Sequence, residues 1–291
     1  MQTFAKLNMQ LGECPRWNPH DAHWYWVDIL GRKLFRSNGS LLNQRELPFT
    51  PACFFFTEQN QILVTADSGI YLLESFSAEP VCLTEASQLP QGHRFNDGTA
   101  TPDGRFIAGT LLDGTSKTGV SYAGQLTGMQ ALQLTERLER YTIINGQCFS
   151  PDGDRYYVAD SPECAVWQYD YDKNSGTLHN KQLFYQFERG QEFPDGAATD
   201  ANGNYWVALY GAGKIAVISP QGERLKEVCV PVSQPTMVAF GGSQGDELLI
   251  TSAAQTLNDA QLSEQPLAGS VFLLKTDTTG SAQPLLKHPT N

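Results

Sequence analysis

The sequence predicts an all-β protein built as a six-bladed β-propeller, and two observations support that fold class. First, a turn followed by an aromatic or branched β-run occurs six times in the 291 residues, at a spacing of roughly 45 residues, the usual length of a propeller blade. The runs occupy residues 24–28, 62–65, 106–109, 156–160, 205–208 and 248–251. Second, no low-complexity linker divides the chain, so we expect a single domain over residues 1–291 with a central channel.

Short strands and tight turns account for the rest of the chain. Dipeptides such as Asp97-Gly98, Asp152-Gly153 and Asn202-Gly203 are typical of turns. We interpret the recurring runs as the innermost strands of the blades and the apolar runs that follow them as second strands; examples of the latter are residues 33–36, 69–73 and 270–274. Residues 85–89 are the best candidate for a short helix, whereas 113–125 and 254–268 are expected to form long polar loops.

The two ends of the chain are expected to close the ring of blades. An open sheet edge favours aggregation, and propellers usually avoid one by pairing a strand from one terminus into the blade of the other. Residues 4–9 and 270–275 are the natural partners for this closure.

Composition excludes several classes of partner. The chain has 20 Lys and Arg against 31 Asp and Glu, a net charge of −11, whereas nucleic acids and anionic membranes need clustered basic residues. A solvated acidic surface and a cation-attracting pocket both explain the charge. No run approaches the ~18 apolar residues of a membrane span, and the first eleven residues contain no apolar segment of signal-peptide length. The six cysteines show no metal spacing, so we expect reduced thiols in a cytoplasmic protein that is a monomer or a weak homo-oligomer.

Four short polar clusters precede the recurring runs and are the candidates for chemistry. They are residues 12–15, 94–98, 145–146 and 194–196. Equivalent positions of successive blades surround one axis, so Glu13, Asn96, Asn145 and Asp195 are expected to meet in the channel. Two carboxylates and two amide oxygens suit Ca²⁺, Mg²⁺ or Mn²⁺, and Zn²⁺ also accepts carboxylates. Taken singly, Asn-Gly and Asp-Gly are ordinary turn formers.

The chain resembles the SMP-30/gluconolactonase/luciferin-regenerating-enzyme family, which includes regucalcin and bacterial sugar lactonases. The resemblance covers nearly the whole chain, and its strength lies in the joint order of many short motifs. They are residues 11–17, 26–29, 94–98, 108–111, 145–146 with 149–152, 194–196 with 200, 203 and 206, 235–236 with 240–242, and 250–253.

The resemblance implies a propeller with one divalent metal ion, Ca²⁺, Zn²⁺, Mn²⁺ or Mg²⁺, in its channel. The family's metal ligands match Glu13, Asn145 and Asp195, and its substrate-contacting residues match Arg94 and Asn96. The family's general base or proton shuttle matches Asp195. Related enzymes often carry a further substrate-contacting Glu after the segment that matches residues 109–111, and Asp113 is the candidate to replace it here.

These residues lead to the hypothesis of a metal-dependent hydrolase that opens a sugar lactone to its aldonic acid. The metal would polarise the lactone carbonyl and stabilise the oxyanion, while Asp195 would either accept the proton of the attacking water or only position that water. The sequence contains no GxSxG motif, which argues against a serine hydrolase. Three alternatives stay open: a metal-dependent hydrolase of other esters or phosphotriesters, a calcium-binding regulatory protein, and a protein-interaction scaffold.

Overall fold

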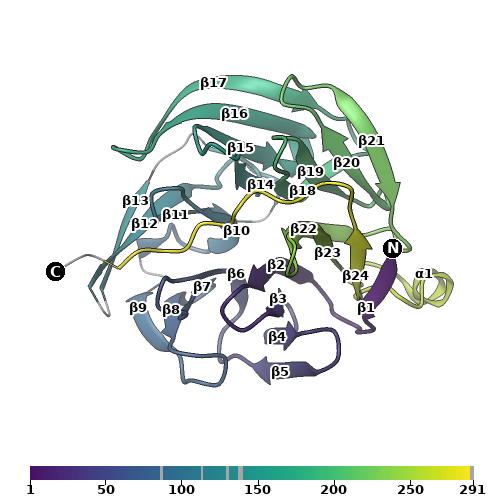
Figure 1. The fold of residues 1–291 in the computed structure, drawn as a ribbon, viewed down its shortest axis with the longest axis horizontal. Helices are drawn as coiled ribbons and strands as arrows, with labels where there is room; N and C mark the ends of the chain where they lie inside the picture. Colours follow the sequence, from purple (N-terminus) through teal and green to yellow (C-terminus); the bar gives the residue numbers. More distant parts are fainter. Residues whose placement is uncertain (86–87, 113, 129–130, 137–139, 289–291) are drawn as a thin grey trace.

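Six four-stranded antiparallel sheets surround a central channel in the computed structural model, which describes residues 1–85, 88–112, 114–128, 131–136 and 140–288 (Figure 1). Within each sheet the strands follow one another from the channel to the rim, apart from the last sheet, which the N-terminal strand completes. The prediction of a six-bladed propeller is therefore confirmed.

The blades take their strands in chain order. Blade 1 contains β2 (Gly12–Asn18), β3 (His23–Asp28), β4 (Lys33–Ser37) and β5 (Leu42–Glu46). Blade 2 contains β6 (Pro51–Phe56), β7 (Ile62–Ala66), β8 (Gly69–Leu73) and β9 (Val81–Glu85). Blade 3 contains β10 (Arg94–Ala100), β11 (Phe106–Leu111), β12 (Ser121–Gly128) and β13 (Ala131–Glu136).

The second half of the ring has the same plan with one longer hairpin. Blade 4 contains β14 (Ile144–Phe149), β15 (Arg155–Asp160), β16 (Ala165–Asp172) and β17 (Thr177–Gln186). Blade 5 contains β18 (Phe193–Thr199), β19 (Tyr205–Tyr210), β20 (Lys214–Ile218) and β21 (Arg224–Cys229). Blade 6 contains β22 (Pro235–Gly241), β23 (Glu247–Ser252), β24 (Val271–Lys275) and β1 (Gln2–Ala5).

The ring is closed by the two ends of the chain, as the sequence predicts. Strand β1 pairs antiparallel with β24, with Gln2 opposite Leu273 and Ala5 opposite Val271. The pairing strand begins two residues earlier than the predicted run. The edge of blade 6 is thereby covered by the N-terminus, and no covalent link is needed to hold the ring.

The recurring runs are the second strands of the blades, not the innermost ones. They form β3, β7, β11, β15, β19 and β23, whose residues are nearly all buried because other strands and blades pack on every side. The runs that we interpreted as second strands lie on the third strands β4, β8 and β24. The polar clusters therefore lie on the innermost strands, β2, β10, β14 and β18, where they face the channel.

Two expectations about long loops were wrong. The predicted loop 254–268 contains α1 (Asp259–Glu264), and Asn258 and Gln261 cap its start by reciprocal hydrogen bonds. The short helix at 85–89 stays a prediction, because Glu85 ends β9, residues 86–87 lie outside the described residues and Gln88 has 3₁₀-helical backbone. The predicted loop 113–125 already contains the start of β12.

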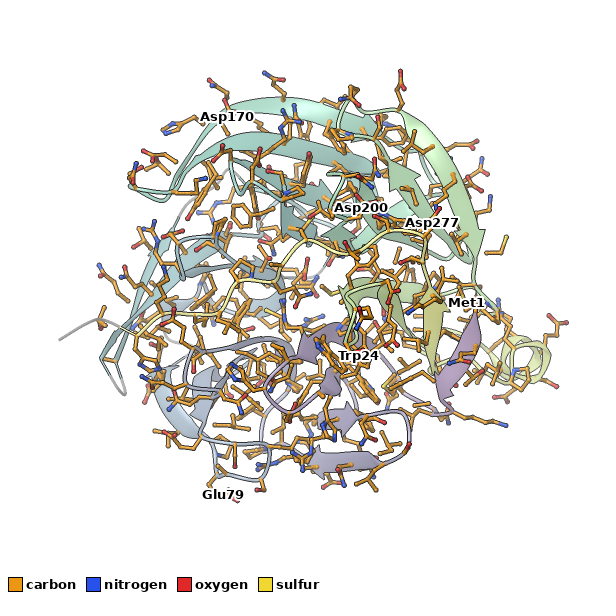
Figure 2. All side chains as sticks on the ribbon, viewed as in Figure 1. Met1, Trp24, Glu79, Asp170, Asp200 and Asp277 are labelled. Atoms are coloured by element: carbon orange, nitrogen blue, oxygen red, sulfur yellow. The ribbon has the colours of Figure 1, made fainter. Side chains whose placement is uncertain are left out.

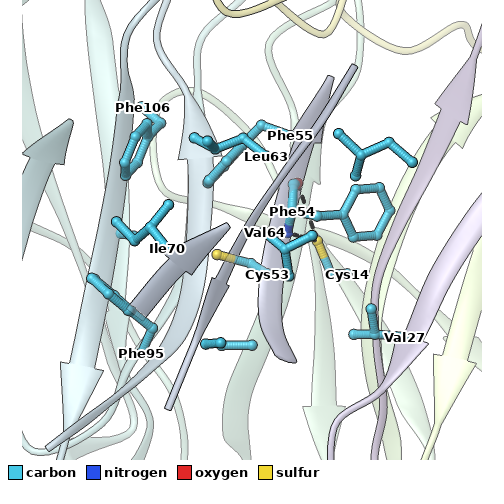
Figure 3. Close-up of a cluster of buried hydrophobic side chains, with 14 of the residues drawn as sticks. Cys14, Val27, Cys53, Phe54, Phe55, Leu63, Val64, Ile70, Phe95 and Phe106 are labelled. Atoms are coloured by element: carbon cyan, nitrogen blue, oxygen red, sulfur yellow. Dashed lines mark hydrogen bonds between the residues drawn. The ribbon is translucent and has the colours of Figure 1, made fainter. Parts of the chain in front are cut away.

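The cysteines are all free thiols, of which four are buried and two, Cys82 and Cys229, are exposed. Cys14 lies in the apolar cluster of blades 1 to 3, where its sulfur accepts a hydrogen bond from the Phe54 amide at 3.3 Å (Figure 3). Among the described residues no helix is long and apolar enough to cross a membrane.

Every inner strand has a β-bulge at the same position. In β2 the register shifts between Glu13 and Arg16, and in β14 between Asn145 and Cys148, so that two residues lie opposite one. The same shift occurs in β6, β10, β18 and β22. A bulge bends the strand and re-aims its side chains, so it selects which residues of each blade point into the channel.

Candidate functional site

The bulges bring the predicted polar residues together. Glu13 and Asn145 each stand directly before the bulge of their strand, and Asn96 and Asp195 are the first residues within theirs. Glu13 and Asn145 are each followed by a residue with positive φ, 51° at Cys14 and 58° at Gly146. A Cβ on Gly146 would lie 2.3 Å from the Tyr205 hydroxyl, so only glycine fits there.

A cavity of about 380 Å³ opens at this end of the channel, and it is lined by residues from blades 1, 3, 4 and 5 and by the loop after β23. The polar residues in its wall are Glu13, Arg94, Asn96, Asn145, Ser161, Asp195, Tyr210 and Gln255. Five of these are sequence-predicted site residues that the structure places in one cavity. Asp113, the sixth, lies outside the described residues.

The two carboxyl groups of the cavity are buried close to other acidic groups, and the charge of Arg94 offsets only part of the effect on the pKa of Glu13. Burial raises the pKa of Glu13 well above its usual range, and the negative charges of Asp195 and Asp97 raise it further. The pKa of Asp195 is raised well above its usual range by burial first and by Asp97 second. Arg94 is the basic residue in the wall, and burial lowers its own pKa. A bound cation would relieve this repulsion.

The donor set fits a hard divalent cation. Among the described residues no three His, Cys, Asp or Glu side chains form a metal cluster. The candidate ligand set instead consists of the carboxylates of Glu13 and Asp195 and the amide oxygen of Asn145. Oxygen-only ligation of this kind, completed by water or substrate, is usual for Ca²⁺ and Mg²⁺.

The two asparagine side chains of the cavity are fixed by hydrogen bonds within and between blades 3 and 4. Asn96 Nδ2 donates to Asn145 Oδ1 at 3.0 Å and to the Ile144 carbonyl at 3.1 Å. Asn145 Nδ2 donates to Ser161 Oγ at 2.8 Å. Arg94 Nη1 donates to the Phe95 carbonyl at 2.9 Å and to Asn96 Oδ1 at 3.3 Å. The wall is therefore pre-organised rather than assembled from free side chains.

Asp97 lies just below the cavity and is buried, with 6% of its surface exposed. Its carboxylate accepts the amides of Gly98 at 2.7 Å and Gln147 at 3.0 Å. Burial nevertheless raises the pKa of Asp97 to about 6, against the opposing effect of these bonds and of Arg16. Its charge, in turn, is one cause of the raised pKa values above it.

Sequence reasoning missed Ser161, Tyr210 and Gln255. Tyr210 ends β19 and Ser161 directly follows β15, so both lie where a second strand ends. Because the second strand runs antiparallel to the inner one, its last residues reach the same mouth as the first residues of the inner strand. The last residues of the second strands were therefore predictable from the sequence as further candidates for the site. The rest of the wall is apolar: Leu11, Leu111, Ile143, Pro162 and Phe193.

Fold and site together define a class of protein: six-bladed propellers with a pre-organised, oxygen-rich cavity at one mouth of the channel. The chain belongs to the SMP-30/gluconolactonase/LRE-like family, because the region that characterises this family matches residues 11–254.

Relatives of known name agree with this assignment. The chain is 37% identical over 280 residues to 6-deoxy-6-sulfogluconolactonase of Pseudomonas putida, covering 94% of each protein. It is 31% identical over 277 residues to regucalcin of Sus scrofa, covering 94% of this chain and 93% of that one. The crystal structure of a calcium-binding protein, regucalcin, from Agrobacterium tumefaciens strain C58 matches with a TM-score of 0.90 at 27% identity, covering 98% and 96%.

Proposed function

We propose that the protein is a metal-dependent lactonase that hydrolyses a sugar lactone to its aldonic acid. The observation that carries this proposal is the meeting of two carboxylates, two asparagine amides and one guanidinium in a single cavity of about 380 Å³. The names of the lactonase relative and of the family support the same reaction class.

Glu13, Asn145 and Asp195 are the residues that would hold the cation, which is Ca²⁺, Zn²⁺, Mn²⁺ or Mg²⁺. When bound, such an ion supplies Lewis-acid polarisation of the lactone carbonyl. Arg94 and Asn96 form the neighbouring wall, and the planar guanidinium is suited to bind the carbonyl or the sugar hydroxyls. Tyr210 and Gln255 line the cavity from blades 5 and 6 and offer a hydroxyl and an amide.

Asp195 is the proposed proton shuttle. A water molecule adds to the carbonyl carbon and gives one proton to the Asp195 carboxylate. The bond between the carbonyl carbon and the ring oxygen then breaks, and Asp195 returns the proton to that oxygen. The product is the open-chain hydroxy acid, and the carboxylate is regenerated.

A second candidate is a metal-dependent hydrolase of other esters or phosphotriesters, which the apolar part of the wall favours. Leu111, Ile143 and Phe193 offer a surface that a hydroxyl-rich sugar does not need. A third is a calcium-binding regulatory role, since the similar Agrobacterium protein is named a calcium-binding protein. A protein that only binds a cation does not need Arg94 and Asn96 in its cavity.

A pH-stat assay of ring opening tests the proposal. Purified protein is stripped with chelator and assayed with glucono-, galactono-, arabinono- and xylonolactone, with 6-sulfonated gluconolactone, and with an aryl ester and a phosphotriester. Ca²⁺, Zn²⁺, Mn²⁺ and Mg²⁺ are then added back one at a time. Turnover of a sugar lactone that is lost on chelation and restored by a metal is the expected result. Turnover of the aryl ester or phosphotriester alone moves the assignment to the second candidate. Metal binding without turnover of any substrate supports the regulatory role.

A further inference from the structure

A chain of hydrogen bonds runs along the wall of the cavity across blades 3, 4 and 5. It starts at the Arg94 guanidinium, which donates to Asn96 Oδ1 at 3.3 Å, and Asn96 Nδ2 donates to Asn145 Oδ1 at 3.0 Å. Asn145 Nδ2 then donates to Ser161 Oγ at 2.8 Å, and the Ser161 hydroxyl donates to the Pro194 carbonyl at 2.7 Å. The chain thus connects proposed substrate contacts to a proposed metal ligand.

The two ends of this chain fix its direction. A guanidinium can only donate hydrogen bonds, and a backbone carbonyl can only accept them. The single hydrogen of the Ser161 hydroxyl goes to Pro194, so the oxygen has only acceptor capacity left for Asn145. The amide of Asn145 must therefore turn its nitrogen toward Ser161, and its oxygen faces the opposite way, toward Asn96 of the cavity wall.

Asn96 does not enforce this orientation alone. Its nitrogen also donates to the Ile144 carbonyl at 3.1 Å, so it keeps a partner whichever way the neighbouring amide faces. Asn145 and Ser161 are both buried, with 7% and 8% of their surfaces exposed. A buried amide nitrogen without an acceptor is costly, so the hydroxyl of Ser161 is what makes one orientation of Asn145 the stable one.

We propose that Ser161 is a positioning residue that aims the Asn145 amide oxygen at a cation in the cavity. It also ties the Pro194 carbonyl, and hence the backbone directly before Asp195, to the same hydroxyl. One side chain thereby sets the relative placement of ligands from blades 4 and 5. A carbonyl oxygen has two lone pairs, so Asn145 Oδ1 can accept from Asn96 and still bind a metal. This inference rests on the proposed metal site.

Metal affinity of Ser161→Ala is the first test. The chelated protein is titrated calorimetrically with Ca²⁺, Zn²⁺, Mn²⁺ and Mg²⁺ chlorides in turn. Loss of an orienting partner outside the metal's own ligands typically weakens binding by roughly 10- to 100-fold, and we expect that range for the metal that binds tightest. With saturating metal, the KM for the lactone should stay within about two-fold.

Ser252→Ala is the matched control. Ser252 is buried and donates its hydroxyl to a backbone carbonyl, that of Ser270, at 2.6 Å, but it does not line the cavity. Both variants lose a buried hydrogen bond from a hydroxyl to a backbone carbonyl, and Ser161→Ala also loses the bond from Asn145. Metal affinity should fall in Ser161→Ala alone; an equal fall in both, or no fall in Ser161→Ala, overturns the proposal.

A measurement on the metal-free protein separates this inference from the proposed function. The side-chain amide protons of Asn145 are followed by NMR hydrogen exchange in chelator. We expect them to exchange slowly in the wild type and at least ten-fold faster in Ser161→Ala. Unchanged exchange shows that Ser161 does not hold the amide, even if the wild type binds metal. A wild type that binds none of the four metals contradicts the proposed function, while the exchange rates still decide the role of Ser161.

Discussion

The two mouths of the channel are built from the same six inner strands but differ in what covers them. The first residues of these strands line the cavity with Glu13, Asn145 and Asp195, whereas their last residues lie at the opposite mouth. There the segment 276–288 crosses the ring in front of the strand ends (Figure 1). It contacts the turn of blade 5 near Asp200 (Figure 2).

Backbone hydrogen bonds attach this segment to blades 2, 3, 5 and 6, and the Gly280 amide donates to the Gly245 carbonyl of blade 6 at 2.9 Å. The Ser281 amide donates to the Thr199 carbonyl at 3.0 Å, and the Leu286 amide donates to the Phe56 carbonyl at 2.9 Å. The Lys287 amide donates to the Gly104 carbonyl at 2.8 Å. The mouth at the ends of the inner strands is thus covered by a segment that pairs through its backbone, whereas polar side chains line the cavity at the other mouth. The bulge in each inner strand marks the boundary between these two uses.

Exchanging Asp195 for Asn should give the largest effect. Loss of a proton-accepting carboxylate costs typically 10²–10⁴-fold in turnover, and Asp195 is also a proposed metal ligand, so we expect kcat/KM for the lactone to fall at least about 10³-fold. Thr199→Val is the counterpart on the same strand β18 at the other mouth, where its hydroxyl donates to the Phe149 carbonyl at 2.6 Å. That variant should lose stability but keep its activity per folded molecule. Similar activity losses in both would contradict the division between the mouths.

Leu286→Ala tests the covered mouth. Leu286 is 1% exposed and packs in the apolar cluster of blades 1 to 3, and truncation of such a residue costs about 2–5 kcal/mol of unfolding free energy. We expect a fall in Tm of several degrees with unchanged metal affinity. Leu225→Ala, at a leucine that is 53% exposed on β21, is the control and should change the unfolding free energy by less than about 0.5 kcal/mol. A loss of metal affinity in Leu286→Ala would show that the two mouths are coupled.

Asp97 lies between the mouths and predicts a pH dependence. Its pKa is about 6 in the folded protein and 3.8 without the fold, so the folded state binds the proton more tightly, and the folded protein loses stability as pH rises from about 4 to 6. For this group alone the loss between pH 5 and pH 7 is about 1 kcal/mol. We expect urea unfolding of the chelated protein to show that loss, and Asp97→Asn to reduce it. An identical pH slope in both proteins would mean that Asp97 is already ionised at pH 5.

Much of this plan was readable from the sequence, because each blade is a local unit that repeats. The recurring runs gave the number of blades, and Glu13, Asn96, Asn145 and Asp195 were placed correctly in one cavity because equivalent positions of a ring converge. The assignment of the runs to the innermost strands was wrong, since an apolar pattern does not say how far a strand lies from the axis.

Apart from ring closure and the convergence of the inner strands, contacts between distant segments were not readable. Ser161 joins the site through the Pro194 carbonyl, 33 residues away. The covering segment bonds to partners still more distant, as in the pairs Thr199–Ser281 and Gln61–His288, which are 82 and 227 residues apart. Such pairs depend on how the finished ring places its surfaces, and no local pattern in residues 276–288 records that placement.

Tyr210→Phe should give the smallest effect and the most specific one. The Tyr210 hydroxyl lies 3.5 Å from Gln255 Nε2 in the cavity wall, and burial raises its pKa, so it stays a neutral hydrogen-bond donor. One hydrogen bond to a sugar hydroxyl contributes about 0.5–1.5 kcal/mol, which corresponds to a rise in KM of roughly 2- to 10-fold. Metal affinity should not change, because a phenol is not one of the proposed ligands.

Tyr185→Phe, on the outer strand β17, removes the same hydroxyl far from the cavity and should leave KM unchanged. A KM that is unaffected in Tyr210→Phe would restrict substrate recognition to the wall of Arg94 and Asn96. A fall in metal affinity instead would mean that Tyr210 contributes to cation binding. Substrate contacts and metal contacts could then not be assigned to different blades of the open mouth.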